Sequence, residues 1–349
     1  MRENLENLVS VVVVNWNRRQ LLRACLESVR AQSGVNLEII VVDNGSGDGS
    51  LDMIEQEFSG GPGPLVRTIA NPDNRGFCAA NNQGIAVARG EWVALLNNDA
   101  EAEPGWLAGL LAAANGRPET GMVACKILVY EDPTRIDKAG HLIYLDGQNR
   151  GRGTGQTDRG QFDRVEEVLW PDGCAALYRR SMLEQIGGFD EDFFAYADDA
   201  ELGMRARIAG WRCIYTPHAV VRHHRGSTLG LLSMRRLILI ERNRVLFAVK
   251  LFPWSLLWIN AGYLLARICA GLWAGMRGQG EVSRFRGLNG KLRIAAALVM
   301  GNLLALPLLP RMLRKRLALK PLRRLTSRQV RRLLIENRIS LRDLMEQAN

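Results

Sequence analysis

The stretch LEIIVVDNGSGDGS (37–50) is an apolar, partly β-branched run that passes directly into a polar, glycine-rich cluster. The run predicts a buried strand over 37–42, and the cluster predicts a loop at its carboxyl end. Similar runs occur at 8–14 (LVSVVVV) and at 92–96 (WVALL). The polar clusters that follow the three strands are Asn15–Asn17, Asp43–Ser50 and Asn97–Asp99. Open α/β sheets bind ligands at the carboxyl ends of their strands, so we expect a ligand site there.

Helices are expected between these strands. Apolar residues at helical spacing predict a helix over about 18–31. A second helix is expected over about 50–58, then a strand near 65–69 and a helix that ends near Gly90. This alternation of strands and helices predicts an α/β fold with a doubly wound sheet.

The rest of the chain divides into three stretches. Residues 146–164 are rich in Gly, Asp and Arg and predict a mobile loop. A second patterned block runs over 168–227, and residues 229–349 are expected to be helical. We therefore expect one region over 1–228 and a helical region after it, with no internal repeat.

Composition excludes two classes of protein. With 349 residues, of which 47% are hydrophobic and 23% charged, the chain is neither disordered nor a small disulfide-stapled module. Its 6 cysteines are scattered without a C-x-x-C pair, which is typical of a reducing compartment. The N-terminal stretch carries two Glu before a short apolar run, so no export signal is expected.

The net charge of +10 is unevenly distributed. Residues 1–228 are net acidic, whereas residues 229–349 are net basic and include long apolar segments. An acidic body with a basic tail indicates two surfaces with different roles.

Asp43-Asn44-Gly45-Ser46 ends a predicted strand. A carboxylate in this place could accept hydrogen bonds from a nucleobase or a ribose, and glycine lets the backbone approach a ligand closely. The alternative is an Asx turn that precedes a helix. The motif is neither G-x-G-x-x-G nor a P-loop, so no dinucleotide or ATP fingerprint is present.

Asn97-Asn98-Asp99 also follows a predicted strand. An acid in this place can hold Mg²⁺ or Mn²⁺ against a diphosphate, because these ions prefer oxygen ligands and keep phosphate in the remaining positions. The alternative is a helix cap, since a helix is expected soon after Pro104.

The segment GGFDEDFFAYADDAELGMRARIAGW (187–211) places six acids around aromatic residues. Such carboxylates are candidates for burial and a raised pKa, as a general base needs. Asp199 falls in the first turn of a helix expected over about 198–209, where the helix dipole favours an anion. The alternative is that Asp198 or Asp199 only caps this helix.

His223 and His224 are adjacent in VVRHHRGST. A neutral imidazole can complete a site built from a carboxylate and a diphosphate. The alternative is an exposed polar pair. The neighbouring Arg222 and Arg225 could contact phosphate or an acidic glycan.

Taken in order, these motifs resemble the family-2 inverting glycosyltransferases with the GT-A fold, and within them the rhamnosyltransferase-like branch. The resemblance covers about residues 8–250. It rests on Val13–Arg18, Asp43–Ser46, Asn74–Phe77, Asn82-x-Gly84, Leu95–Asp99, Gly173, Arg179-Arg180, Gly187–Glu191, Phe193-Phe194-x-Tyr196-x-Asp198-Asp199-x-Glu201-Leu202, Arg205, Gly210 and His223–Ser227.

The resemblance implies a role for each matching position. It implies that Asp199 is the catalytic base with Asp198 beside it, and that Asp99 and His223, or less favourably His224, bind a divalent metal, Mg²⁺ or Mn²⁺. The positions that it places near the nucleotide sugar are Asn15, Asn17, Asp43, Asn44, Arg75, Gly76, Asn97 and Asn98. In this interpretation residues 1–100 are a nucleotide-sugar half and residues 101–228 an acceptor half.

Three positions depart from the family pattern. Asn97 replaces the first acid of the D-x-D element, which leaves Asp99 as its carboxylate ligand. Trp16 stands where Tyr is usual, and Glu201 where Asp is frequent. No Q-x-x-R-W motif occurs, which argues against a processive synthase of the cellulose or hyaluronan type.

The implied activity is transfer of a sugar, L-rhamnose from dTDP-rhamnose in our first hypothesis, to a lipid-linked cell-surface glycan. UDP-galactose, UDP-GlcNAc and GDP-mannose are the alternative donors. A non-catalytic glycan- or nucleotide-binding scaffold is the alternative of another class. A nucleic-acid binder is disfavoured because the basic residues lie in Leu-rich helices with few aromatic residues for base stacking.

Two segments of the basic region, 251–276 and 294–310, are apolar and flanked by basic residues. Each is near the roughly 20 residues that cross a bilayer. Our first hypothesis is docking in the plane of an anionic, cytoplasmic membrane face, beside a polyprenyl-diphosphate-linked acceptor. Spanning the bilayer is less favoured, and a helical core or an oligomer interface is the third alternative.

Overall fold

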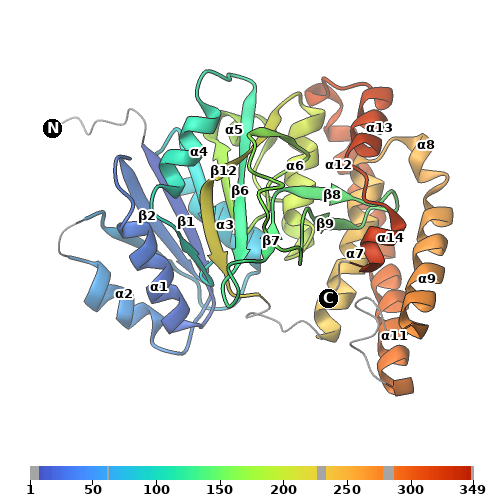
Figure 1. Cartoon of the computed structure of the whole chain (residues 1–349), viewed down its shortest axis with the longest axis horizontal. Helices are drawn as coiled ribbons and strands as arrows, with labels where there is room; N and C mark the ends of the chain where they lie inside the picture. Colours follow the sequence, from blue (N-terminus) through green and yellow to red (C-terminus); the bar gives the residue numbers. More distant parts are fainter. Residues whose placement is uncertain (1–7, 61–62, 226–232, 278–286, 347–349) are drawn as a thin grey trace.

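The computed structural model of the chain describes residues 8–60, 63–225, 233–277 and 287–346. A mixed sheet of ten strands forms its centre. Eight of the strands follow the order β10-β12-β6-β11-β4-β1-β2-β3, and of the other two β5 pairs with β12 and β7 with β6. Helices cover both faces of this sheet, and the C-terminal helices gather at one end of the molecule (Figure 1). The predicted α/β class with a doubly wound mixed sheet is confirmed.

The first part of the chain alternates strands and helices. Its elements are β1 (Val9–Asn15), α1 (Arg19–Arg30), β2 (Leu37–Asp43), α2 (Ser50–Phe58), β3 (Val66–Ala70), α3 (Phe77–Val87) and β4 (Trp92–Leu96). β1 pairs in parallel with both β2 and β4, and β2 pairs in parallel with β3. These bounds confirm the strands and helices that the sequence predicts here.

The second part adds antiparallel pairs to the sheet. Its elements are β5 (Ala100–Ala102), α4 (Trp106–Ala114), β6 (Thr120–Val129), β7 (Ile136–Lys138), β8 (His141–Ile143), β9 (Asn149–Gly151), β10 (Glu166–Val168), β11 (Ala175–Arg179), α5 (Arg180–Ile186), the 3-10 turn η1 (Glu191–Phe193), α6 (Asp198–Ile208) and β12 (Arg212–His223). β11 runs antiparallel to β4 and β6, so its first residue lies at the same sheet edge as the last residues of β4.

Strand β1 is apolar along its length because both faces of the sheet are covered. Val11 and Val13 pack with α1 on one face, and Val12 packs with α3 on the other. Burying a side chain of this size contributes about 1.5–3 kcal/mol, so a one-residue shift in register would be costly.

The loop expected over 146–164 is only partly a loop. It contains β9, which pairs with β8, and its acids Asp158 and Asp163 lie 2.8 and 2.5 Å from Lys126 Nζ. The Lys126 side chain is only 8% exposed and needs counter-ions, so it holds this segment against the sheet.

The described residues from 233 onward are mainly helical, and Arg338 forms an isolated β-bridge with Ile143 of β8. The elements of this region are α7 (Met234–Leu251), α8 (Trp254–Leu257), α9 (Asn260–Met276), α11 (Gly287–Ala305), η2 (Leu306–Leu308), α12 (Leu309–Ala318), η3 (Lys320–Leu322), α13 (Ser327–Glu336) and α14 (Leu341–Glu346). The predicted boundary at 228/229, like Ser227, lies outside the described residues.

One hydrophobic cluster joins the C-terminal helices to the sheet. Phe247 of α7 and Met312 of α12 belong to the same buried cluster as Trp170 and as Tyr178 of β11. The Trp170 and Phe247 rings lie 6.0 Å apart, edge to face. These helices therefore complete the core that supports the sheet.

Candidate active site

The polar clusters after β1, β2 and β4 meet at one edge of the sheet, as expected. Asn15 Nδ2 donates to Asp43 Oδ2 at 2.8 Å, and Asn98 Nδ2 donates to Asn15 Oδ1 at 2.7 Å. All three side chains are buried. β1 lies between β2 and β4 and aligns Asn15 with Asp43, so this contact follows from strand register.

Asp43 forms a turn with the residues that follow it. Its Oδ1 accepts from the Ser46 backbone N–H at 2.8 Å and its Oδ2 from the Ser46 hydroxyl at 2.6 Å. Asn17 donates its backbone N–H to the same hydroxyl at 2.7 Å and accepts from the Gly47 N–H at 3.0 Å. The Asx turn is therefore present, while the nucleobase contact of Asp43 stays a prediction.

The start of α3 is fixed by Gly76 and Asn44. Gly76 has a φ of 87°, and a Cβ added to it would lie 2.5 Å from the Phe194 ring, so only glycine fits. Asn44 donates to the Gly76 carbonyl at 3.3 Å. Arg75 beside them is exposed, and Asn97 is half-buried.

Asp99 faces His223. The His223 Nε2 lies 3.5 Å from Asp99 Oδ1, and its Nδ1 lies 2.7 Å from Asp137 Oδ2. Burial alone would lower the pKa of His223, but Cys174, Asp137 and Asp99 outweigh burial and raise it well above its usual value. Asp99 does not cap a helix. The next helix, α4, begins at Trp106, and its N-cap position is Gly105, with no side-chain cap bond.

His224 lies apart from this group. Its Nδ1 is 3.0 Å from Glu131 Oε1, and its ring stacks on Tyr130 at 3.6 Å between centroids. His223 is therefore the histidine beside Asp99, and an exposed pair of histidines is the wrong description. Arg222 pairs with Glu103 at 2.5 Å, and Arg225 pairs with Asp137 at 3.0 Å.

Asp99 and His223 fit a divalent cation, which would take the place of the proton that the neighbouring groups hold on His223, because only the neutral imidazole binds a metal. Among the described residues, Asp99 Oδ1 is buried without a hydrogen-bond partner. A buried polar atom without a partner is unfavourable unless a ligand completes it. Two ligand atoms bound to one ion at about 2.0–2.2 Å lie about 3–3.5 Å apart, close to the 3.5 Å between Asp99 Oδ1 and His223 Nε2.

Asp198 and Asp199 are the first two residues of α6, and neither occupies its N-cap, which is Ala197. Asp199 nevertheless satisfies one N–H of the first turn, so the capping alternative holds in part for Asp199. Asp199 Oδ2 accepts from the Gly173 N–H at 3.2 Å and its Oδ1 from the Ala200 N–H at 2.7 Å. Burial raises the pKa of Asp199, and burial followed by the Asp199 charge raises the pKa of Asp198 well above its usual value.

Three residues around Asp199 were not predicted from the sequence. His141 Nε2 lies 2.8 Å from Asp172 Oδ2 and 3.4 Å from Asp199 Oδ2, and Lys138 Nζ lies 2.7 Å from Asp172 Oδ2. Burial would raise the pKa of Asp172, but Lys138 and His141 lower it well below its usual value. Asp172 precedes β11, and this antiparallel strand brings its start to the sheet edge where the parallel strands end.

His141, Asp172 and Asp199 are also close enough for a metal, since one ligand atom from each lies within 4.8 Å of the others. The Lys138 ammonium, however, already supplies positive charge to Asp172. Both groups contain one buried atom without a hydrogen-bond partner among the described residues, Asp99 Oδ1 and His141 Nδ1, so the Lys138 charge is what makes the donor set beside His223 the better one for a cation.

The chain reaches Asp198 through a strained segment. Phe194, Tyr196 and Ala197 have φ values of 64°, 71° and 56°, although none of them is glycine. Phe194, with ψ at −60°, is the centre of a γ-turn closed by a 2.7 Å bond from the Ala195 N–H to the Phe193 carbonyl. Each such conformation costs on the order of 1–3 kcal/mol, and such strain clusters at active sites.

Comparison with known proteins decides the family. A sequence profile described as "Glycosyl transferase family 2" matches residues 10–187. The chain belongs to this family. It carries the GT-A fold, as the sequence motifs predict.

The relatives of this glycosyltransferase include the N-acetylglucosaminyl-diphospho-decaprenol L-rhamnosyltransferase of Mycobacterium tuberculosis, which is 30% identical over 65% of this chain and 79% of that protein. The O-antigen biosynthesis protein RfbC of Myxococcus xanthus is 31% identical over 63% of this chain and 17% of that protein. The resemblance to the rhamnosyltransferase-like branch is confirmed.

A solved structure has the same fold. The mannosyltransferase PcManGT from Pyrobaculum calidifontis, in complex with GDP-Man and Mn²⁺, matches with a TM-score of 0.53 at 20% identity, over 90% of this chain and 85% of that one. At this identity the likeness concerns the fold alone.

Proposed function

We propose that this glycosyltransferase is inverting and metal-dependent and transfers L-rhamnose from dTDP-rhamnose to a lipid-linked, cell-surface glycan. The observation that carries the proposal is a buried carboxylate, Asp199, placed on the same sheet edge as the Asp99–His223 pair. His223 contacts Asp137, and the next residue, Lys138, contacts Asp172 beside Asp199, so the two groups are connected through β7.

In the proposed reaction Asp199 removes the proton of the acceptor hydroxyl as that oxygen attacks the anomeric carbon. The positive charge of Lys138 favours the ionised form that a base needs. A divalent ion held by Asp99 and His223 would neutralise charge on the departing nucleoside diphosphate. One displacement inverts the anomeric carbon and needs no nucleophile from the protein.

The rhamnosyltransferase relative supports rhamnose as the transferred sugar. The diphospho-decaprenol in the name of that relative supports a lipid-linked acceptor. UDP-galactose, UDP-GlcNAc and GDP-mannose are the alternative donors. The acceptor is proposed to be a glycan on a polyprenyl diphosphate. The contrasting proposal is a non-catalytic scaffold on the same fold.

The proposal predicts stereochemistry. With dTDP-rhamnose and a polyprenyl-diphosphate-linked N-acetylhexosamine, the purified protein should form a rhamnoside whose anomer is opposite to that of the donor, measured by NMR of the product. A product of retained configuration contradicts inversion. If transfer occurs only from another nucleotide sugar, that nucleotide sugar replaces dTDP-rhamnose as the proposed donor. If the protein catalyses neither sugar transfer nor donor hydrolysis with any of the four donors, the result favours the non-catalytic scaffold.

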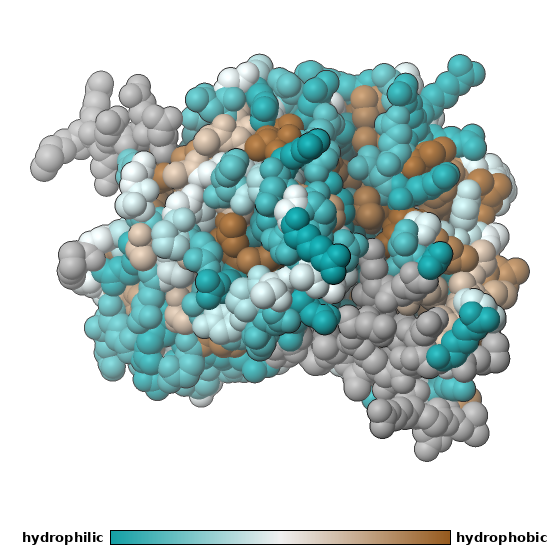
Figure 2. Space-filling view, viewed as in Figure 1, coloured by the Kyte–Doolittle hydropathy of each residue, from teal (hydrophilic) through white to brown (hydrophobic). Residues whose placement is uncertain are grey.

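The C-terminal helices expose apolar surface next to basic residues. Figure 2 shows brown, apolar residues over the side formed by α8 and α9. Trp258 is 83% exposed. In the same region, the Arg316 guanidinium lies over the Trp254 ring and the Arg277 guanidinium over the Trp273 ring. Residues Gly290–Leu322 are a helical stretch that comprises most of α11 together with η2, α12 and η3. By length and composition this stretch is apolar enough to cross a membrane, and 17% of its most apolar window is buried.

We propose that this surface docks in the plane of an anionic membrane at its cytoplasmic face. Aromatic residues and arginines at one surface suit the boundary between lipid head groups and acyl chains. Arg244 Nη2 donates to Asn302 Oδ1 at 3.1 Å and ties α11 to α7, which supports docking over crossing. An interface between copies of the chain is the alternative occupant.

Vesicle binding tests this surface. Trp258→Ser should lower the affinity for phosphatidylglycerol vesicles about tenfold, measured by co-sedimentation. The binding free energy contributed by the apolar indole surface is lost, and about 1.4 kcal/mol of it corresponds to a tenfold change in affinity. Leu65→Ser is the matched control, because Leu65 is 62% exposed on the first part of the chain. Equal binding by the two variants contradicts docking, and a change in oligomeric state with Trp258→Ser supports the interface instead.

A further inference from the structure

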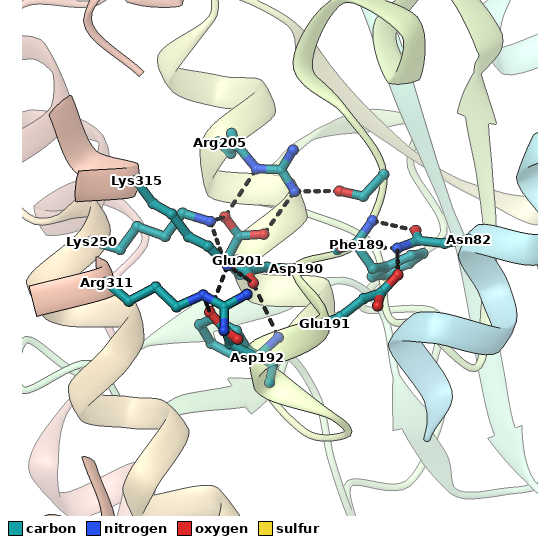
Figure 3. A network of polar contacts seen from close by, with 12 residues as sticks. Asn82, Phe189, Asp190, Glu191, Asp192, Glu201, Arg205, Lys250, Arg311 and Lys315 are labelled. Atoms are coloured by element: carbon teal, nitrogen blue, oxygen red, sulfur yellow. Dashed lines mark hydrogen bonds and ion pairs between the residues drawn. The ribbon is translucent and has the colours of Figure 1, made fainter. Parts of the chain in front are cut away.

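The segment Asp190–Ala197, which leads into Asp198 and Asp199, is held by helices that lie far apart in the sequence (Figure 3). On one side Asn82 of α3 accepts from the Phe189 N–H at 2.7 Å and donates to Glu191 at 3.1 Å. On the other side lie side chains of α7 and α12. We call Asp190–Ala197 the base-carrying segment.

Asn243 of α7 holds the strained turn. Its Nδ2 lies within hydrogen-bond distance of three carbonyls of the segment: Phe193 at 2.9 Å, Ala195 at 2.8 Å and Tyr196 at 2.7 Å. The side chain is fully buried. These carbonyls belong to the stretch that contains the three positive φ values. Backbone in such conformations persists only where its surroundings fix it, and Asn243 provides that fixation.

Lysines from two C-terminal helices hold the acids of the segment (Figure 3). Lys250 Nζ of α7 lies 2.6 Å from both Asp190 and Glu201, and Glu201 belongs to the base-bearing helix α6. Lys315 of α12 contacts Asp190 and lies 2.7 Å from Asp192. Burial would raise the pKa of Asp190, but Lys250 and then Lys315 lower it to about 2, so these pairs persist at neutral pH.

We propose that Asn243 and Lys315 are positioning residues that set the placement of the catalytic base from the C-terminal helices. This inference rests on the proposed function of Asp199. α12 carries Lys315 on its inner side and the exposed Leu313 and Leu317 on its outer side, so the proposed membrane surface and the base-carrying segment share one helix. The membrane-facing helices are thereby part of the catalytic apparatus.

The test separates positioning from folding. Asn243→Asp keeps the volume but replaces the donor with an acceptor that faces three carbonyls, so it should lower kcat about 100-fold, as a displacement of about 1 Å can. Lys315→Ala should lower kcat about tenfold, and Lys315→Arg should restore it. Donor KM and nucleotide affinity should stay within about twofold, because the residues near Asp43 and Asp99 are untouched.

Arg314→Ala is the matched control, since Arg314 is exposed on the same helix. If Asn243→Asp does not fold, the Lys315 variants carry the test. The inference is overturned if the Lys315→Ala kcat equals that of Arg314→Ala, if Lys315→Arg does not restore it, or if kcat and nucleotide affinity fall together. Asp199→Asn, assayed in parallel, tests the proposed function separately: if it retains turnover, the assigned base is wrong whatever the Lys315 variants do.

Discussion

Asp199→Asn is expected to lower kcat about 10²–10⁴-fold, the usual contribution of a positioned general base. Asparagine has nearly the same shape as aspartate, and its Oδ1 can still accept from the Ala200 N–H, so the start of α6 should be preserved. Sugar transfer is the measurement, with nucleotide affinity and the midpoint of thermal unfolding as evidence of an intact fold. Turnover within about tenfold of the unmodified protein would contradict the assignment of Asp199.

The pH profile gives a second readout of the same group. The groups that face Asp199 are Asp198, Asp172, Lys138 and His141. Because burial raises the pKa of Asp199, activity should be present above that raised pKa and be lost as pH falls through it, higher than for an ordinary aspartate. Lys138→Met removes a positive charge that lowers this pKa and should move the acid limb to higher pH.

Asp99→Ala is expected to abolish metal-dependent nucleotide binding. In thermal unfolding with Mn²⁺ and UDP, dTDP, GDP or CMP, one nucleotide should stabilise the unmodified protein. At about 100 times its Kd the gain is about 2.7 kcal/mol, or about 4 °C for a chain of this length. The Asp99→Ala protein should show no gain, because the carboxylate that would hold the ion against the diphosphate is absent.

The two adjacent histidines provide a matched control for this measurement. His223→Ala should reduce the Mn²⁺-dependent gain, whereas His224→Ala, which removes a side chain paired with Glu131, should leave it unchanged. A gain that persists without Mn²⁺, or that survives in the Asp99→Ala protein, would contradict a metal held by Asp99.

Local sequence was sufficient to predict the parallel part of the sheet, β1 to β4. The runs that became β1, β2 and β4 are buried on both faces, so their apolar pattern identified them without tertiary information. The meeting of Asn15, Asp43 and Asn98 followed from the rule that ligand sites lie at the carboxyl ends of parallel strands.

The same rule could not predict Asp172 as part of the site. Asp172 precedes a strand, and only the antiparallel pairing of β11 with β4 brings it to that edge. His141 and Lys138 are isolated in the sequence, and their side chains meet Asp172 only through tertiary packing. Asn243 and Lys315 lie in a region whose composition indicated membrane contact, so nothing local linked them to catalysis.

The single hydrophobic cluster that joins α7 and α12 to the sheet has a consequence for how such enzymes can diverge. A chimera that joined residues 1–228 to the helices of a relative would have to preserve the partners of Trp170 and Tyr178 as well as a group in the place of Asn243. The C-terminal helices therefore cannot be exchanged as a detachable module without repacking this cluster. In evolution we expect the sheet and the C-terminal helices that pack on it to change together.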